Sequence, residues 1–444
     1  MTKDSRPLFQ VILFFLVACV PTGHALATLS LESSFTVTGT YTDNLFFDAN
    51  NKKDDFGTLF GPNLSIQFAN ADVVLGAAYA GRLGVFVNNP NANKSLHNVN
   101  LILDLPFLNK LHKGLTVSID ETMRFTPQLD AFSGSSAENI STRAFRAGSR
   151  TGTRPEGSPS LWSGGTQGVF TTRNNAFLNR AALTASYAWT PRVSSSLGYR
   201  NQYRRFSSND FQDSVAHIGT FSLPYLVQEG TTLTPSYSYR QIDFIGGGTQ
   251  STSADKIISH STQLGISHAL TPSLTGTIKG GVAWTKQQGA EETARSSGGG
   301  TRQQSVSDQW ATNFVGSASI TKRFRLSSLS LNVGQSIGGG GGLGSQATRT
   351  RTATGSLSHT FTRRLTGSGS VGYAQNVSVD GNAFDTTTYR IQSRFTYVFL
   401  RWLSGNIGYT YTNQNSKGSA ANDLTVNQVF LGLTAFADPW IPIR

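Results

Sequence analysis

The sequence predicts an all-β fold, a transmembrane up-and-down antiparallel β-barrel of about 18 strands, with about 16 as the alternative. Three observations support this prediction. Apolar and polar residues alternate over almost the whole chain, and successive side chains of a strand point to opposite faces. After the amino terminus, no stretch approaches the roughly 20 continuous apolar residues of a membrane-spanning helix. The 444 residues include 46 Gly and only 14% charged residues, and Ser, Thr, Tyr and Phe are abundant, which favours strands and turns over helices.

The amino terminus has the order typical of a secretory signal peptide. Lys3 and Arg6 precede an apolar run over residues 8–20, and a small-residue cleavage site ends at Ala27. A lipobox ending at Cys19 is the alternative, in which this single cysteine of the chain becomes a lipidated first residue. The position of Ala27 after helix-breaking residues favours cleavage. A cleaved chain has no cysteine, which excludes disulfides and thiolate metal sites.

We therefore expect three parts. Residues 1–27 form a signal peptide that is cleaved, residues 28–437 form an outer-membrane barrel, and residues 438–444 form a C-terminal tail. Within the barrel region the alternating pattern stops over residues 128–171, which are predicted to be the longest loop.

Segments of alternating pattern follow one another, the first over residues 31–46. Taken in order, they carry these apolar residues on one face: Phe35, Val37 and Tyr41; Phe60, Leu64 and Phe68; Leu75, Tyr79 and Val85; Val99, Leu101 and Leu103; Val117, Ile119 and Phe125; Phe177, Leu183 and Tyr187; Leu197, Tyr199 and Tyr203; Val215, Phe221 and Leu223; Leu233 and Tyr237; Leu264 and Ile266; Ile278 and Trp284; Phe314 and Ile320; Leu329 and Val333; Leu357 and Phe361; Val371 and Tyr373; Ile391 and Phe395; Ile407 and Tyr411; Val429 and Leu433.

The connections between these segments are of two alternating kinds. Tight basic or Thr-Pro turns lie at residues 190–192, 270–273, 321–323 and 362–364, and longer linkers rich in Gly, Asn and Ser lie at 246–253, 288–303, 338–346 and 413–422. Short turns at one end and long loops at the other are typical of outer-membrane barrels, and a bilayer requires such a sheet to close on itself.

Four tryptophans fit this topology. Trp189 and Trp402 lie beside short turns, and Trp284 and Trp310 lie beside a long loop, so we expect them to mark the two membrane interfaces. A large soluble β protein also places tryptophan near strand ends. That alternative leaves unexplained why the faces opposite the apolar ones carry Thr, Ser, Gln and Arg rather than a shared core.

The predicted inner faces hold most of the functional information, because the chain carries a net charge of +12. If the apolar faces contact lipid, nine basic residues point into the lumen, against only Glu32, Asp104 and Asp120. These predicted anion-binding residues are Arg82, Arg124, Arg180, Arg200, Arg204, Arg240, Lys279, Arg390 and Arg394. A pore lined by one sign of charge concentrates the opposite ion, and guanidinium pairs with carboxylate and phosphate. The alternative is that these side chains pair with loop carboxylates and stiffen the wall.

The long loop adds four more basic residues, Arg143, Arg146, Arg150 and Arg154. They are candidates for a constriction if the loop folds inward, as long loops of porins do. The alternative is an external loop.

No catalytic residue, metal site or cofactor is predicted. The GxGxxG match at residues 367–372 lies inside an alternating strand, and the glycine run at 338–342 lacks the ending of a phosphate loop. His217, His260, His268 and His359 fall on the lipid-facing register, and only His97, near the outer rim, keeps a hydrolase as a remote alternative. The basic charge does not indicate nucleic acid, because an exported chain rarely meets it.

Residues 41–46, Tyr-Thr-Asp-Asn-Leu-Phe, and residues 422–433 resemble a family of proteobacterial-type outer-membrane barrels linked to exopolysaccharide biosynthesis and export. The resemblance covers the whole mature length in architecture but only these motifs in sequence. It implies a porin-like barrel that assists polysaccharide passage or surface display. One departure concerns assembly: residues 438–444 follow the last strand, so the aromatic end that the barrel-assembly machinery recognises would be Phe436 or Trp440.

The sequence thus favours a passive pore in the outer membrane of a Gram-negative cell, which passes anionic solutes or an acidic exopolysaccharide. The alternative is a non-conducting scaffold for an envelope or polysaccharide secretion assembly. The expected partners are outer-membrane lipid, lipopolysaccharide and the barrel-assembly machinery. The number of copies in the assembly does not follow from the sequence.

Overall fold

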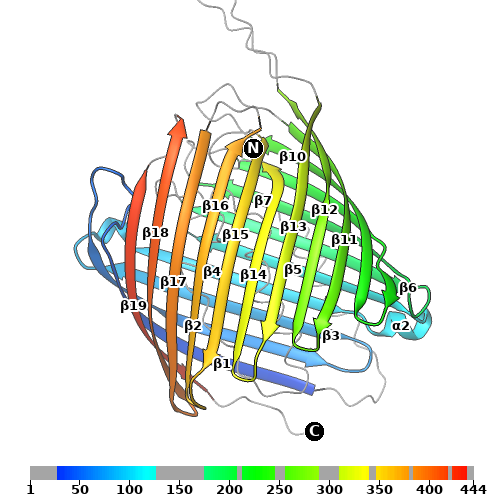
Figure 1. Ribbon diagram of the computed structural model, residues 1–444. Helices are drawn as coiled ribbons and strands as arrows, with labels where there is room; N and C mark the ends of the chain where they lie inside the picture. Colours follow the sequence, from blue (N-terminus) through cyan, green and yellow to red (C-terminus); the bar gives the residue numbers. More distant parts are fainter. Residues whose placement is uncertain are drawn as a thin grey trace, which may run out of the picture.

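The chain folds into a closed antiparallel barrel of 18 strands (Figure 1). The computed structural model describes residues 28–126, 175–207, 213–245, 256–289, 310–339, 347–379, 384–418 and 423–437. The sheet contains 19 strand segments, but β8 and β9 both pair with β10 and together occupy one place in the barrel, where Pro224 interrupts the strand. The pairing of β1 with β19 closes the cylinder.

Around the barrel the strands lie in chain order, apart from β8 and β9, which share one place beside β10. Their bounds are β1 Thr28–Thr42, β2 Asp55–Ala69, β3 Val74–Phe86, β4 Lys94–Asp104, β5 Leu115–Thr126, β6 Ala176–Ala188, β7 Ser194–Phe206, β8 Asp213–Ser222, β9 Tyr225–Gln228, β10 Thr231–Ile245, β11 Lys256–Thr271, β12 Leu274–Gln288, β13 Trp310–Arg323, β14 Ser327–Gly339, β15 Ala347–Thr360, β16 Leu365–Ser378, β17 Phe384–Leu400, β18 Leu403–Gly418 and β19 Leu424–Phe436.

Short turns and long linkers alternate between the two ends of the barrel, as the sequence predicts. In Figure 1 the tight turns that join β11 to β12, β13 to β14, β15 to β16 and β17 to β18 lie together at the bottom. We call this the turn end and the opposite end the loop end. A five-residue helix, α2 (Phe107–Leu111), lies in the β4–β5 connection at the turn end, and a 3-10 turn, η1 (Pro90–Ala92), lies between β3 and β4. Among the described residues, no helix is long and apolar enough to cross a membrane.

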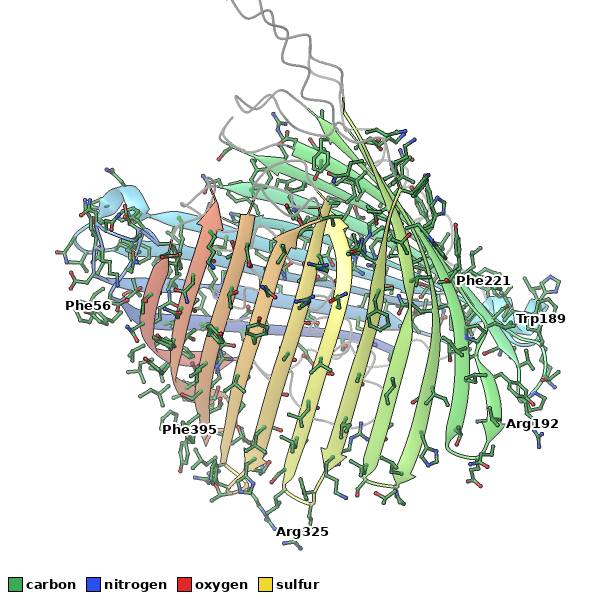
Figure 2. All side chains as sticks on the ribbon, turned by 45° about the horizontal axis from the view of Figure 1, so that its top comes forward. Phe56, Trp189, Arg192, Phe221, Arg325 and Phe395 are labelled. Carbon is green, nitrogen blue, oxygen red and sulfur yellow. The ribbon has the colours of Figure 1, made fainter. Side chains whose placement is uncertain are left out.

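The strand register places apolar side chains on the outside. Val37 of β1 lies opposite Phe60 of β2 and Leu433 of β19, and the three are among many large apolar side chains that remain exposed or half-exposed. Figure 2 shows Phe56, Phe221 and Phe395 pointing away from the barrel. Hydrocarbon around a closed barrel gives these side chains an apolar environment, because no backbone edge is left open to lipid.

Several predicted boundaries were wrong. β1 ends at Thr42 rather than at residue 46, because Asn44 begins a turn. The side-chain amide of Asn44 donates to the carbonyl oxygen of Asp48 and accepts from the backbone N–H of Asp48. β18 runs on to Gly418, so residues 413–418 belong to a strand, where Asn413 bonds Thr425 of β19. Gly338 and Gly339 likewise belong to β14.

Two apolar clusters lie inside the barrel near the loop end. Ala216, Ile242 and Ile257 of β8, β10 and β11 pack with Ala347 of β15. A second cluster contains Ala283 of β12, Val315 of β13 and Ile337 of β14, and Val379 contacts both clusters. Since β15 lies several strands away from β8 and β10 in the sheet, parts of the wall that are not neighbours meet at this end.

Candidate functional site

The inner wall of the barrel is the candidate site. The register turns all nine basic residues named above to the side opposite the apolar one, on β3, β5, β6, β7, β10, β12 and β17. The nine side chains differ in their contacts. They divide into a dense patch, side chains that hold the wall together, and isolated positions.

The dense patch lies on three adjacent strands. Arg124 of β5 and Arg204 of β7 flank Leu178 in one row of paired residues, and Arg180 of β6 occupies the next row. Arg200 lies four residues before Arg204 on the same face of β7. Because adjacent strands are about 4.8 Å apart, the four guanidinium groups arise from an area about 10 Å wide. This is the highest local density of positive charge on the described inner wall.

Arg82 stabilises the wall. Its Nη1 donates to the carbonyl oxygens of Gly61 (3.2 Å), Pro62 (3.2 Å) and Gly81 (2.6 Å), and its Nη2 donates to Asn63 Oδ1 (2.7 Å). Pro62 has no backbone N–H, and the β2–β3 ladder skips residues 61 and 62. The guanidinium therefore occupies the place of missing backbone donors, and Arg82 is only 6% exposed.

Arg240 of β10 holds the loop end of β14. Its Nη1 donates to the carbonyl oxygen of Ile337 at 2.8 Å, although β10 and β14 are not neighbours in the sheet. The backbone N–H of Ala347 on β15 similarly donates to Oε1 of Gln287 on β12 at 3.0 Å. These two hydrogen bonds join the same walls that the apolar clusters join, so the lumen is narrowed at the loop end by β14 and β15.

Arg394 lies over an aromatic ring on the inner wall. Its Cζ is 5.2 Å from the centroid of Phe430, and this ring covers Gly408, where a Cβ atom would come within 2.1 Å of the ring. A cation over a ring is attracted by the electron density of the ring face. Arg390, four residues earlier, is 4% exposed, whereas Lys279 is exposed on β12.

The wall opposite the dense patch is mostly lined by uncharged polar residues, with Arg390 and Arg394 of β17 and Glu32 of β1 as its charged members. Its inward residues come from β15 to β19 and β1, and many of them bond one another across strands, as in Thr350 to Asn376 (2.8 Å), Thr388 to Gln414 (3.4 Å) and Thr36 to Thr434 (3.1 Å). The inner surface therefore has a cationic side and a hydroxyl- and amide-bearing side.

The three acidic residues expected in the lumen also lie on inward register positions. Of the three, Asp120 lies closest to the dense patch. Asp120 of β5, Ala182 of β6 and Arg200 of β7 are paired in one row, so two strand spacings separate the carboxylate from Arg200. The loop candidates Arg143, Arg146, Arg150 and Arg154 lie outside the described residues. Among those described, no three His, Cys, Asp or Glu side chains gather as a metal site would require.

The five histidines of the described strands lie on outward register positions, namely His97, His217, His260, His268 and His359. His97, on which the hydrolase alternative rested, has Nδ1 3.0 Å from the hydroxyl of Tyr79, and its ring lies between Tyr79 and Phe125. The same pair recurs as Tyr199 with His217 (2.8 Å) and Tyr237 with His260 (2.7 Å).

Further polar pairs lie on the outer face near the loop end, as the tyrosine–histidine pairs do. They were not predicted from the sequence. Asn179 donates to Glu121 at 2.9 Å, and Arg351 donates to Gln335 at 2.8 Å, although all four occupy outward positions. Polar and amphipathic side chains collect where hydrocarbon gives way to headgroups. The available signal was a polar residue at an outward position near the loop end of a strand, as at Glu121, Asn179 and Gln335.

The two sequence motifs behind the family resemblance meet in space. Both carboxylate oxygens of Asp43 accept hydrogen bonds from Asn427, one from the backbone N–H (2.7 Å) and one from the side-chain amide (2.6 Å). The hydroxyl of Tyr409 donates to the same amide group at 2.6 Å. The motifs therefore form the two sides of the β1–β19 closure.

Comparison with known proteins supports the architecture. Residues 310–436, which hold β13 to β19, match a family model described as "Putative beta-barrel porin 2". No curated protein sequence matches the chain.

Among solved structures, OpdL of Pseudomonas aeruginosa has a TM-score of 0.45 at 12% identity and covers 92% of this chain and 99% of its own. OccK2 (OpdF) of the same organism has a TM-score of 0.44 at 12% identity, over 91% and 98%. OccAB4 of Acinetobacter baumannii has a TM-score of 0.41 at 11% identity, over 94% and 100%. At such values the likeness carries no argument about function.

The closed pairing and the apolar exterior identify the molecule as a porin-like barrel of the outer membrane.

Proposed function

We propose that this barrel is a passive pore that favours anions. The observation that carries the proposal is the patch of Arg124, Arg180, Arg200 and Arg204 on the inner face of three adjacent strands. A water-filled lumen with low-dielectric walls focuses such a charge and raises the local concentration of anions. Guanidinium groups also bind carboxylate and phosphate in a bidentate manner.

An acidic exopolysaccharide is the finer form of this proposal. The resemblance of the closing motifs to barrels of polysaccharide export supports it. The lumen wall also supports it. The carboxylate of an acidic sugar can bind the arginines on one side of the lumen, and the hydroxyl groups of the sugar can bind Thr, Asn and Gln on the other side. Neither feature requires the pore to be selective for one sugar.

A non-conducting scaffold is the second candidate. It is favoured by the contacts across the lumen side of the wall at the loop end, where Arg240 of β10 bonds Ile337 of β14 and Ala347 of β15 bonds Gln287 of β12. Single-channel recording in planar bilayers separates the two candidates, since a scaffold gives no current steps.

The double variant Arg200→Ala, Arg204→Ala tests the charge argument. The single variant Arg205→Ala is the matched control, because Arg205 belongs to the same strand but lies on the outward register opposite Phe177. We expect the double variant to lose anion preference and the control to keep it.

A further inference from the structure

The wall of the barrel is not hydrogen-bonded along its full height between β13 and β14. Their ladder ends at the pair Gly316 and Gln335, although β13 extends for six more residues, Trp310–Val315, toward the loop end. Over the same height β13 keeps its pairing with β12, and β14 keeps its pairing with β15 up to Gly339 and Ala347. In Figure 1 the upper part of β14 curves away from β13.

The upper part of β14 turns into the lumen. Ile337 is 7% exposed and packs on Ala283 and Val315, which are inward residues of β12 and β13. Its carbonyl oxygen accepts the hydrogen bond from Arg240 described above. An apolar cluster thus lies directly behind the place where the two strands part.

The outer side of this place combines aromatic and cationic groups. Trp310 is 49% exposed and Phe314 is 60% exposed, both on the outward face of the unpaired part of β13. Lys286 of β12 is the register partner of Trp310. At the foot of the opening, Gln335 donates to the carbonyl oxygen of Phe314 at 2.7 Å and accepts from Arg351 at 2.8 Å.

Its height fits the headgroup layer of the outer leaflet. Open backbone groups cost several kcal/mol each in hydrocarbon, so a parted ladder is tolerated only where water and headgroups reach it. Gln335 and Arg351 belong to the outward polar level near the loop end, and tryptophan favours the same layer. A molecule at this place would have its head among cationic groups and its chain beside apolar ones.

We propose that the corner between β13 and β14 is a lateral opening through which an amphiphile with an anionic head and an apolar chain passes between lumen and outer leaflet. Trp310 and Phe314 form its outer lip, Lys286 and Arg351 attract the head, and Ile337 with Ala283 and Val315 receives the chain. The opening widens when Ile337 moves off these two side chains. The inference rests on the proposed function only in taking the lumen as a route.

A reversible disulfide tests this opening. Val315→Cys with Ile337→Cys joins the two strands across it, and Ala318→Cys with Val333→Cys joins paired residues of the same strands below it as a matched control. The probe is a decanesulfonate with a photoreactive group at the end of its chain, added to protein in lipid vesicles. Mass spectrometry then measures the label on the peptide that carries Ala283.

We expect label on that peptide in the unmodified protein, background label in the oxidised Val315–Ile337 variant, recovery after reduction, and no effect of the control disulfide. Arg351→Gln should weaken labelling by about fivefold, as expected for a loss of about 1 kcal/mol of interaction with the head. Label that persists in the oxidised variant, or that is absent from the unmodified protein, overturns the opening. Ion current recorded in parallel keeps the two proposals apart: label without current upholds the opening and rejects the pore, and current without label does the reverse.

Discussion

Arginines on one face of a barrel differ in what their guanidinium groups do. Arg82 bonds three backbone carbonyl groups and Asn63, Arg240 bonds Ile337, and Arg394 lies over Phe430. All three had been predicted as anion ligands from alternation alone. Alternation determines the face on which a side chain lies, but it does not reveal that Pro62 leaves carbonyl groups that need a donor.

Replacing Arg82 by Met should destabilise the barrel without changing ion selectivity. The variant leaves buried carbonyl groups of Gly61 and Pro62 without their donor, at a cost of about 1–3 kcal/mol for each group. Urea unfolding of the protein in lipid vesicles measures the loss. Arg200→Ala serves as the comparison, since it should alter selectivity more than stability. An Arg82→Met barrel of unchanged stability would contradict the structural role.

At the scale of strands and turns, the sequence predicted most of the structure. Period-two alternation identified every barrel strand and both faces of the hairpin formed by β6 and β7. The predicted strand ends were less accurate, because polar strands such as the end of β18 continue beyond the lipid, where alternation of apolar residues no longer applies. The contacts of β14 and β15 with β10 and β12 depend on tertiary packing, and no local pattern announces them.

The β1–β19 closure should depend on Asp43 and Asn427. Asn427→Leu removes both side-chain hydrogen bonds and leaves a carboxylate oxygen of Asp43 without its donor, so we expect a loss of about 1.5–3 kcal/mol. The folded fraction after refolding is measured from gel migration, because unheated folded protein migrates differently from heated unfolded protein. Asn413→Leu, on the next strand and bonded only to Thr425, is the control. Equal folding of Asn427→Leu and the parent protein would show that the motif has another role.

The turn after β1 should loosen in acid. Asp48 accepts hydrogen bonds from the backbone N–H groups of Asn51 and Asn50, and these bonds hold the pKa of its carboxyl below the ordinary value of 3.8. A lowered pKa means that the stabilisation is present above the unfolded pKa and is lost as the pH falls through the folded one. Hydrogen exchange at the amides of Asn50 and Asn51 should therefore accelerate below this range, relative to intrinsic rates. Asp48→Asn should abolish that pH dependence, and its persistence would exclude Asp48 as the cause.

At the scale of the whole molecule, the barrel has two chemically different walls. The patch on β5 to β7 is densely cationic, the wall from β15 through β19 to β1 is mostly uncharged and polar, and apolar clusters pack β14 and β15 against β8 and β10 to β13 at the loop end. The alternating pattern predicted the closed barrel and its outer face. It did not predict the narrowing by β14 and β15, since these contacts form only when the sheet has closed.

The anion preference of the pore can be measured as the reversal potential of single channels under a salt gradient. We expect the sign of potential that denotes anion preference. The potential should move toward zero in the double variant Arg200→Ala, Arg204→Ala and stay unchanged in Arg205→Ala. The change in the anion-to-cation ratio should be at most about tenfold, the factor that corresponds to 1.4 kcal/mol. Cation preference in the unmodified protein, or an unchanged potential in the double variant, would contradict the proposed anion pore.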